Sequence, residues 1–287
     1  MFNELILPLA LNGLIWGLII ALIALGLSVI FGLLDVINLA HGDFFMVGTV
    51  LAWGVIESTG NFWLALALVP VAGFILGAAV ERVVIAPIKG AASLSIVATF
   101  GLSMMLQEAV RGTYGASPKR ILPPLEGTVP LFGIDYEIYR LLAAAIALGA
   151  LGAFFWFLHR TKMGVWMRAV RHNREMATAM GIPVQRVFVV TFAIGVALAA
   201  LGGVVAAPIT TVDFRTGVDV LPFCFMAVII GGLGNLLGTA AAAVLLAFME
   251  GVITSFADPT TARISSLCLM SAVLLVRPQG LFAGATR

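Results

Sequence analysis

Charged residues are scarce in this sequence. Only 10% of its 287 residues are Asp, Glu, Lys or Arg, whereas 61% are hydrophobic and the mean hydropathy is +1.12. Soluble domains are about 25% charged and about 45–50% apolar, and a chain of this size could not bury so much apolar surface in one or two cores. The composition therefore excludes an ordinary soluble protein and predicts an integral membrane protein.

Cysteine is also nearly absent. Cys224 and Cys268 both lie in apolar runs with no histidine nearby, where free cysteines behave as small hydrophobic residues. The sequence therefore provides neither a disulfide framework nor a set of metal ligands. The net charge is only +2, which argues against the clustered basic face that binding to nucleic acid requires.

Motifs for catalysis and nucleotide binding are missing as well. The chain has no GxxxxGK[ST], HExxH, GxSxG or CxxC pattern, and its three histidines are scattered. The glycine-rich stretch "GGLGN" at 231–235 lacks the lysine and hydroxyl of a phosphate-binding loop, so we interpret it as a helix break or a packing element. We predict no catalytic residue and do not expect an enzyme.

What the chain has instead is apolar runs close to the 20 or so residues that a membrane-crossing helix needs. We predict an all-α polytopic membrane protein, a bundle of eight or nine transmembrane helices that allows for broken or re-entrant segments, in one domain over residues 1–287. The N-terminus has no basic region, so the first run should remain in the mature protein. The runs are 5–33, 43–57, 62–85, 92–110, 138–158, 187–208, 218–236, 238–256 and 264–277.

Glycine is frequent inside these runs. Several glycines are spaced four apart, in "GLIWG" at 13–17, "GFILG" at 73–77 and "GNLLG" at 234–238. Small residues at this spacing let two helix backbones approach closely in lipid. We therefore predict tight helix packing at these three places.

Basic residues concentrate in one connection, residues 159–186, which holds six of the sixteen in the chain and only one acid, Glu175. Because loops rich in lysine and arginine stay in the cytoplasm, we predict that this loop is cytoplasmic. Alternation of the spans then places 81–90 and the C-terminus on the same side, and the N-terminus, 111–137 and 210–219 on the outer side.

Residues 173–183 within this loop carry the signals of a short surface helix. Asn173 is a candidate N-cap, Glu175 suits the positive end of the helix, and Gly181 followed by Pro183 ends it. The helix either lies against the bundle or the lipid interface, or docks into a cytoplasmic partner, and the long basic connector favours docking. The apolar residues that would face something other than water are Met176, Ala177, Met180 and Ile182.

Polar residues cluster after the first run, at Asp35, Asn38, His41 and Asp43. The span count places the cluster at the cytoplasmic end of that run, where Gly42 predicts a helix break. Asp35 and Asp43 would then reach the interface or cap helix ends, and Asn38 and His41 would share one helix face. Other polar residues in the runs, which usually face a bundle interior, a cavity or a partner, are Asn12, Gln107, Glu108, Asn235 and Glu250.

Three separated parts of the chain resemble a known family. The run "NGLIWGLIIALIALGLSVIFGLLDVINLAHGDFFMVGTVLAW" at 12–53 is similar to the N-terminal signature of branched-chain amino acid ABC permeases of the LivH type. The loop "MRAVRHNREMATAMGI" resembles their cytoplasmic coupling segment, and "AVIIGGLGNLLGTAAAAVLL" with "LLVRPQGLF" resembles their C-terminal pattern. The likeness covers nearly the whole chain and is weakest at 111–137.

The resemblance implies a multi-pass subunit of a bacterial ABC importer in the inner (plasma) membrane. Such a subunit moves branched-chain or other hydrophobic or neutral amino acids by alternating access. It pairs with a second LivM-like permease or another copy of itself, binds two cytoplasmic ATPase subunits, and receives substrate from a periplasmic or extracellular solute-binding protein. ATP and Mg would be bound by the ATPases, and this chain would hold no cofactor or metal.

The resemblance also suggests roles for individual residues. The acid and arginines of the loop would pair with the ATPase, and Met176 with Ala177 would fill its groove. The expected coupling residues are Arg168, Arg171, Glu175, Met176, Ala177 and Gly181. The expected residues of the substrate pathway or its inner gate are Asn38, His41, Gly42 and Asp43.

Other functions stay open at this point. The same family includes importers of urea, short amides and small carboxylic acids, and the lack of a strong charged site in the spans fits any neutral or zwitterionic solute. An ATP-independent channel or secondary transporter would instead use Asp35, His41 and Asp43 as a proton or ion relay. A membrane scaffold that transports nothing would need no polar residues in its interior.

Overall fold

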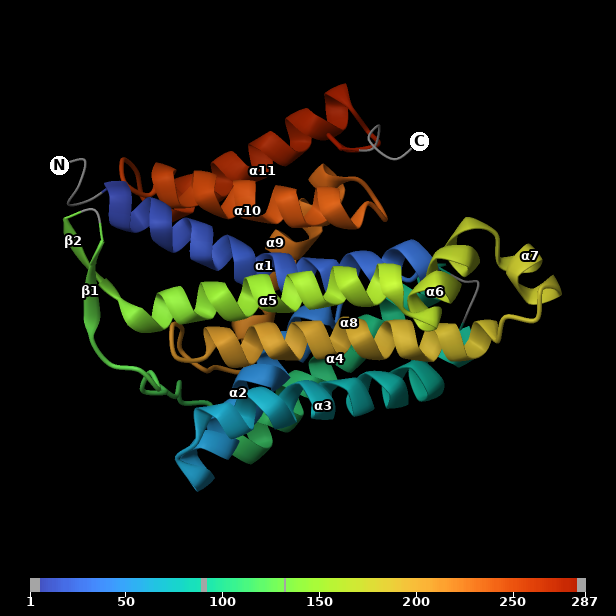
Figure 1. Ribbon diagram of the computed structural model, residues 1–287, viewed down its shortest axis with the longest axis horizontal. Helices are drawn as coiled ribbons and strands as arrows, with labels where there is room; N and C mark the ends of the chain where they lie inside the picture. The colour runs from blue at the N-terminus through green and yellow to red at the C-terminus, as the bar shows by residue number, and fades with distance from the viewer. Residues whose placement is uncertain (1–5, 89–91, 132, 283–287) are drawn as a thin grey trace.

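The computed structural model describes residues 6–88, 92–131 and 133–282, and these form a helical bundle with one short β-hairpin (Figure 1). A π-helix, Glu81–Ile85, and a 3-10 turn, Ala86–Ile88, extend the third helix. The hairpin pairs β1 (Thr128–Leu131) with β2 (Ile134–Glu137). The helices are α1 (Leu7–Leu34), α2 (His41–Thr59), α3 (Phe62–Val80), α4 (Ala92–Tyr114), α5 (Ile138–Arg160), α6 (Lys162–His172), α7 (Arg174–Ala179), α8 (Val184–Ala206), α9 (Thr216–Gly231), α10 (Leu236–Ile253) and α11 (Pro259–Val276).

Seven helices in the described part of the chain are long and apolar enough to cross a membrane: α1, α3 with its extension, α4, α5, α8, α10 and α11. The other two predicted runs correspond to α9, a shorter apolar helix of 16 residues, and to α2, which includes His41, Asp43 and Glu57. The prediction of an all-α polytopic membrane protein is therefore confirmed, and the protein is a multi-pass membrane protein.

Connections that were predicted on opposite sides of the membrane lie at opposite ends of the bundle. The start of α1 and the β1–β2 hairpin are at the left in Figure 1, and α6 and α7 are at the right. We call these the hairpin end and the α7 end. The basic loop 159–186 therefore forms one end of the molecule, and the connection around the hairpin forms the other.

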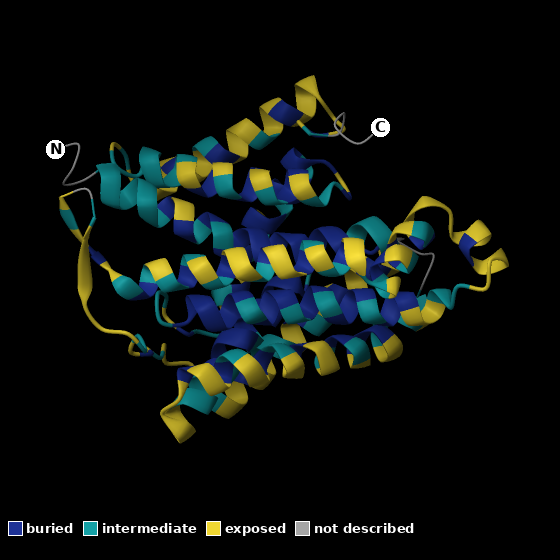
Figure 2. Ribbon diagram, in the orientation of Figure 1, coloured by how far each residue is buried: buried dark blue, intermediate teal, exposed yellow. Residues whose placement is uncertain are grey.

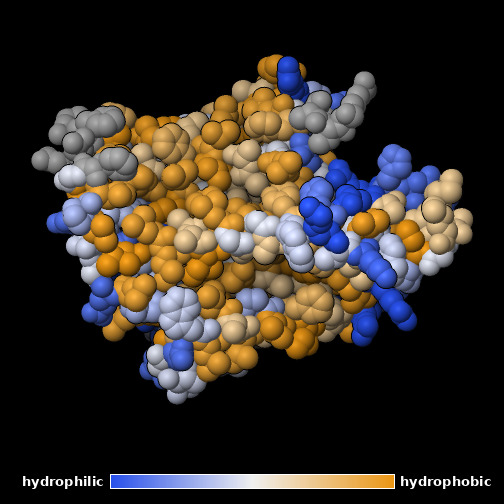
Figure 3. Space-filling view, viewed as in Figure 1, coloured by the Kyte–Doolittle hydropathy of each residue, from blue (hydrophilic) through white to orange (hydrophobic). Residues whose placement is uncertain are grey.

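Two helices form the core of the bundle. In the most apolar 18-residue stretch of each long helix, 83% of the residues are buried in α1 and 78% in α8, but only 17–33% in the other five. Figure 2 shows the difference: α8 is mostly dark blue, whereas exposed yellow positions recur along α5 and α3. The exposed positions are largely apolar, and Figure 3 shows a broad hydrophobic surface along the bundle. Such a surface suits contact with lipid.

The core helices meet their neighbours at glycines, as the four-residue spacing predicted. A Cβ atom on Gly13 of α1 would lie 2.5 Å from the carbonyl oxygen of Ala247 and 3.1 Å from the Cα of Gly251, both on α10. Side chains at these positions would force the helices apart. The same applies to Gly17 against α10, Gly73 and Gly77 of α3 against α8, and Gly238 of α10 against α9. The prediction is wrong for Gly234, which lies in the turn before α10 and faces the Arg171 side chain.

We expect Gly13→Ala to lower the stability of the bundle, because overpacking a close contact costs about 1–3 kcal/mol. The matched control is Gly149→Ala on α5, where an added Cβ has no neighbour within 4 Å. Thermal unfolding of the detergent-solubilised protein, followed by intrinsic fluorescence, should give a lower Tm for Gly13→Ala only. Equal Tm values for the two variants would show that the α1–α10 contact tolerates a side chain.

Candidate gate and coupling sites

The first helix ends at Leu34, and the chain then turns back into the bundle. Asp35 adopts the left-handed conformation (φ 54°), and its N–H donates to the carbonyl of Phe31 at 3.0 Å, which terminates α1. His41, the first residue of α2, places its Nε2 2.9 Å from the carbonyl oxygen of Ile23, in the middle of α1. Helix α2 therefore starts deep inside the protein, and segment 35–40 is re-entrant.

This placement corrects the prediction for the polar cluster. Asn38 and His41 have 0% exposure and Asp43 has 2%, so only Asp35 lies at the surface. Asn38 precedes α2 in non-helical backbone, so it does not share a helix face with His41. Asp43 is the first-turn acid of α2, as predicted, but it is buried in the bundle and does not reach the interface.

Helix α4 supplies the hydrogen-bond partners of this buried segment. The Thr99 hydroxyl accepts from the N–H of Leu39 at 3.1 Å and lies 3.2 Å from the carbonyl of Ile37. Gln107 Nε2 donates to Asp43 Oδ1 at 3.0 Å. Gln107 was among the polar residues noted in the sequence, whereas Thr99 was missed, because a threonine within a helix carries no signal of a long-range role.

Two polar atoms in this buried segment lack partners. Asn38 Nδ2 and His41 Nδ1 have no hydrogen bond to any residue that the structure describes. An unsatisfied buried group costs about 1–3 kcal/mol, so these two atoms favour a bound water or another polar group beside them.

Helices α2 and α9 touch directly through backbone at this point. A Cβ on Gly217, in the first turn of α9, would lie 2.6 Å from the carbonyl oxygen of Gly42. The break predicted at Gly42 is therefore located before it, at 35–40, and Gly42 is helical. Glycine is required there because the backbone of α9 leaves no room for a side chain.

The predicted surface helix is present as α7 and is capped as expected. Asn173 Oδ1 accepts from the N–H of Met176 at 2.8 Å, and Gly181 follows the helix with φ 78°. Met176 and Met180 are 60% and 76% exposed, whereas Ala177 is buried against its own chain. Of the pair expected to fill a partner's groove, only Met176 is therefore accessible. Glu175 is exposed beside it.

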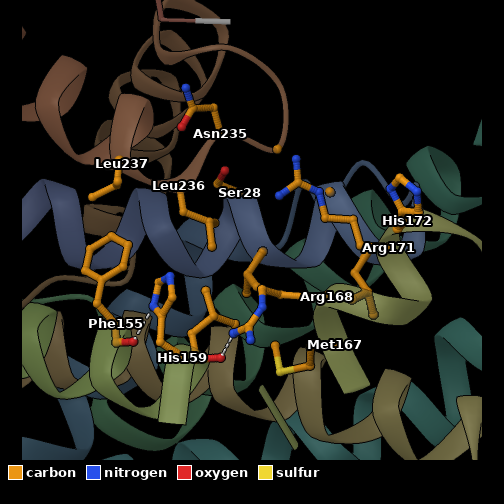
Figure 4. A pocket seen from close by; sticks show the side chains of 15 residues that line it. Ser28, Phe155, His159, Met167, Arg168, Arg171, His172, Asn235, Leu236 and Leu237 are labelled. Carbon is orange, nitrogen blue, oxygen red and sulfur yellow. Dashed lines mark hydrogen bonds between the residues drawn. The ribbon is translucent and has the colours of Figure 1, made fainter. Parts of the chain in front are cut away.

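The two predicted coupling arginines lie on α6 and line a cavity of about 530 Å³ (Figure 4). An Arg168 Nη1 N–H donates to the carbonyl of Leu158, near the end of α5. The Arg171 guanidinium lies beside Gly234, whose missing side chain leaves room for it. The structure thus separates the expected coupling residues into an α6 pair at a cavity and a group on α7.

A second cavity, of about 360 Å³, opens at the hairpin end. It brings together Asn12 of α1, Arg140 of α5, Glu250 of α10 and Arg263 of α11. Asn12 Oδ1 accepts from Arg140 Nη1 at 2.9 Å and from the Tyr136 hydroxyl at 2.6 Å. Asn12 and Glu250 were noted in the sequence, but their cationic neighbours come from distant segments. The cavity can face both positive and negative groups of a solute.

Such a bundle, with a re-entrant polar segment at its centre and a short exposed helix at one end, has the features of a membrane transport subunit. The chain belongs to the family of permease components of the branched-chain amino acid transport system, whose family model matches residues 9–276. The family predicted from the three sequence stretches is therefore confirmed. The protein is a transmembrane permease of the ABC transporter class.

The chain is similar to three curated permeases of this kind. The high-affinity branched-chain amino acid transport system permease protein LivH of Salmonella typhimurium is 28% identical over 94% of this chain and 93% of its own. BraD of Pseudomonas aeruginosa is 27% identical over the same shares. The probable permease LivM of Methanocaldococcus jannaschii is 26% identical over 76% of this chain and 67% of its own. No solved structure matches the chain.

Proposed function

We propose that this permease is the transmembrane subunit of a bacterial ABC importer in the inner (plasma) membrane, and that it carries branched-chain or other hydrophobic or neutral amino acids by alternating access. The family match over residues 9–276 carries the proposal. The exposed Met176 and Met180, on and just after α7, support it. Burying an apolar side chain in a partner's groove removes it from water and so lowers the free energy of the complex.

The proposed assembly has three kinds of protein partner besides lipid. Two ATPase subunits bind ATP and Mg at the α7 end, a second permease lies beside this chain in the membrane, and a solute-binding protein delivers substrate at the hairpin end. The similarity to a LivM permease supports a related second permease. The basic loop 159–186 supports a cytoplasmic position of the α7 end.

Movement of the ATPases would pass from α7 into the core of the permease. Glu175 and Met176 contact the ATPase, and buried Ala177 ties α7 to its own bundle. Residues 180–183 connect α7 to α8, whose Ala200 and Gly203 pack against the backbone of α2. Helix α8 can therefore transmit a displacement of α7 to the buried segment at the start of α2.

That segment is the proposed inner gate of the pathway, formed by Asn38, His41, Gly42 and Asp43. The backbone contact between Gly42 and Gly217 allows α2 to shift against α9 without interlocking side chains. Asn38 and His41 each keep one polar atom without a partner among the described residues, and a polar solute or water in the pathway could bond to it. The rival relay of Asp35, His41 and Asp43 has less support, because Asp35 is at the surface and the other two are buried.

The cavity at the hairpin end supports a zwitterionic or neutral substrate. Its arginines can face a carboxylate and Glu250 an ammonium group, while Trp16 and Phe223 offer apolar surface. Urea, short amides and small carboxylic acids remain the alternative substrates, since the two arginines of the cavity outnumber Glu250.

We expect the co-purified complex in liposomes to take up labelled leucine only when ATP is supplied on the side of the ATPases. An uncoupler should leave this uptake unchanged, because no ion gradient drives it. The chain alone, reconstituted in parallel, should transport nothing. Uptake by the chain alone, driven by an ion gradient, would refute the importer and favour the secondary transporter. Labelled urea in the same assay distinguishes the alternative substrate.

Substitutions on α7 and in the turn that follows it should uncouple ATP hydrolysis from transport. Glu175→Ala removes the proposed ion pair, and Gly181→Val strains a residue with φ 78°, so uptake per ATP should fall several-fold while the complex still assembles. Lys162→Gln, an exposed basic residue at the start of α6, is the control and should behave as the native protein. Normal coupling in both α7 variants would show that the contact is made elsewhere.

The gate can be tested at His41 with two replacements. His41→Leu removes the bond to the Ile23 carbonyl, whereas His41→Gln retains an amide N–H that can donate to it. We expect uptake to fall about tenfold or more in the leucine variant and clearly less in the glutamine variant, with assembly checked by size-exclusion chromatography. Native uptake rates in both variants would remove His41 from the gate.

A further inference from the structure

The cavity at the α7 end collects positive charge without a compensating acid (Figure 4). Arg168 and Arg171 of α6 supply this charge, His172 of α6 and His159 of α5 also line the cavity, and none of the described lining residues is Asp or Glu. A basic hollow between membrane helices attracts anions, and its potential is strengthened by the low-dielectric walls around it.

The start of α10 adds further donors to the same cavity. Leu236 and Leu237, the first two residues of this 18-residue helix, line it. The Asn235 side chain caps the N–H of Gly238 at 3.1 Å, and no described residue accepts from the N–H groups of Leu236 and Leu237. Uncapped N–H groups at the start of a helix favour an anion. The arginines and this helix end therefore point to the same kind of ligand.

The remaining wall of the cavity is apolar. Val29 and Leu33 of α1, Phe155 and Leu158 of α5, and Leu236 contribute hydrocarbon surface beside the arginines. Figure 3 shows hydrophilic residues gathered at this end, directly beside the hydrophobic surface of the bundle. A small soluble anion would leave the apolar wall unused, whereas a molecule with a charged head and hydrocarbon chains matches both parts.

We propose that this cavity binds the phosphate-bearing headgroup of an anionic phospholipid. Arg171, with room beside Gly234, and Arg168 face the phosphate, and the apolar wall receives the glycerol and the first part of the acyl chains. The lipid bridges α1, α5, α6 and α10, and so braces the helix that precedes α7. The proposal requires only that this end lies at a membrane surface, so it stands or falls apart from the importer function.

Native mass spectrometry of the protein tests this site. The protein is taken from nanodiscs of phosphatidylcholine alone or of phosphatidylcholine mixed with phosphatidylglycerol. We expect selective retention of phosphatidylglycerol, with about fivefold weaker retention for Arg171→Gln and a similar further loss on adding Arg168→Gln. Arg171→Lys should retain more lipid than Arg171→Gln, which separates loss of charge from misfolding. Arg160→Gln, an exposed arginine near the cavity that does not line it, should retain phosphatidylglycerol as the native protein does.

Four other results would overturn the proposal. Equal retention of phosphatidylcholine, or equal loss in Arg160→Gln, would show that no specific anion site exists. Displacement of phosphatidylglycerol by inorganic phosphate would show that the cavity takes a free anion. Displacement by the ATPase subunits in the full complex would show that an acidic side chain of the partner occupies it.

Discussion

In hydrocarbon, every backbone N–H and C=O must find a partner within the protein. This constraint applies with particular force to the buried, non-helical segment between α1 and α2. Segment 35–40 cannot use helical hydrogen bonds. Thr99 of α4 bonds the backbone of Leu39 and approaches that of Ile37, and Asn38 Oδ1 accepts from the N–H of Ala40. Helix α4 is thereby tied to the centre of the bundle, and a polar segment becomes tolerable at that depth.

The helices around this segment are closely packed. Lipid provides no hydrophobic drive between helices, so glycine contacts and their dispersion energy hold the bundle together. Helix α8 lies at the centre of this arrangement, since it contacts α1, α2 and α3 and begins where the α7 connection ends. A helix that is both buried and continuous with the surface loop can move only by displacing its neighbours, which suits a part that transmits motion.

The two ends of the protein present different chemistry. The cavity at the hairpin end combines arginines with Glu250, whereas the cavity at the α7 end has basic residues without an acid. A site with both signs of charge accepts a zwitterion, and a site with one sign selects an anion. The proposed substrate contacts and the proposed lipid site therefore use different residues, at opposite ends of the bundle.

The sequence by itself determined the membrane class, most of the helices, the family, and the caps of α7, because composition, apolar length and capping depend on residues adjacent in the chain. It also located the helix break to within a few residues. Only the tertiary structure decided that the break turns inward, that Ala177 is buried, and that Arg168 and Arg171 line a cavity. These outcomes depend on partners 60 or more residues away, such as Thr99 for Leu39 and Gly234 for Arg171. A side chain's environment is set by whichever helices pack around it, and local sequence does not encode that choice.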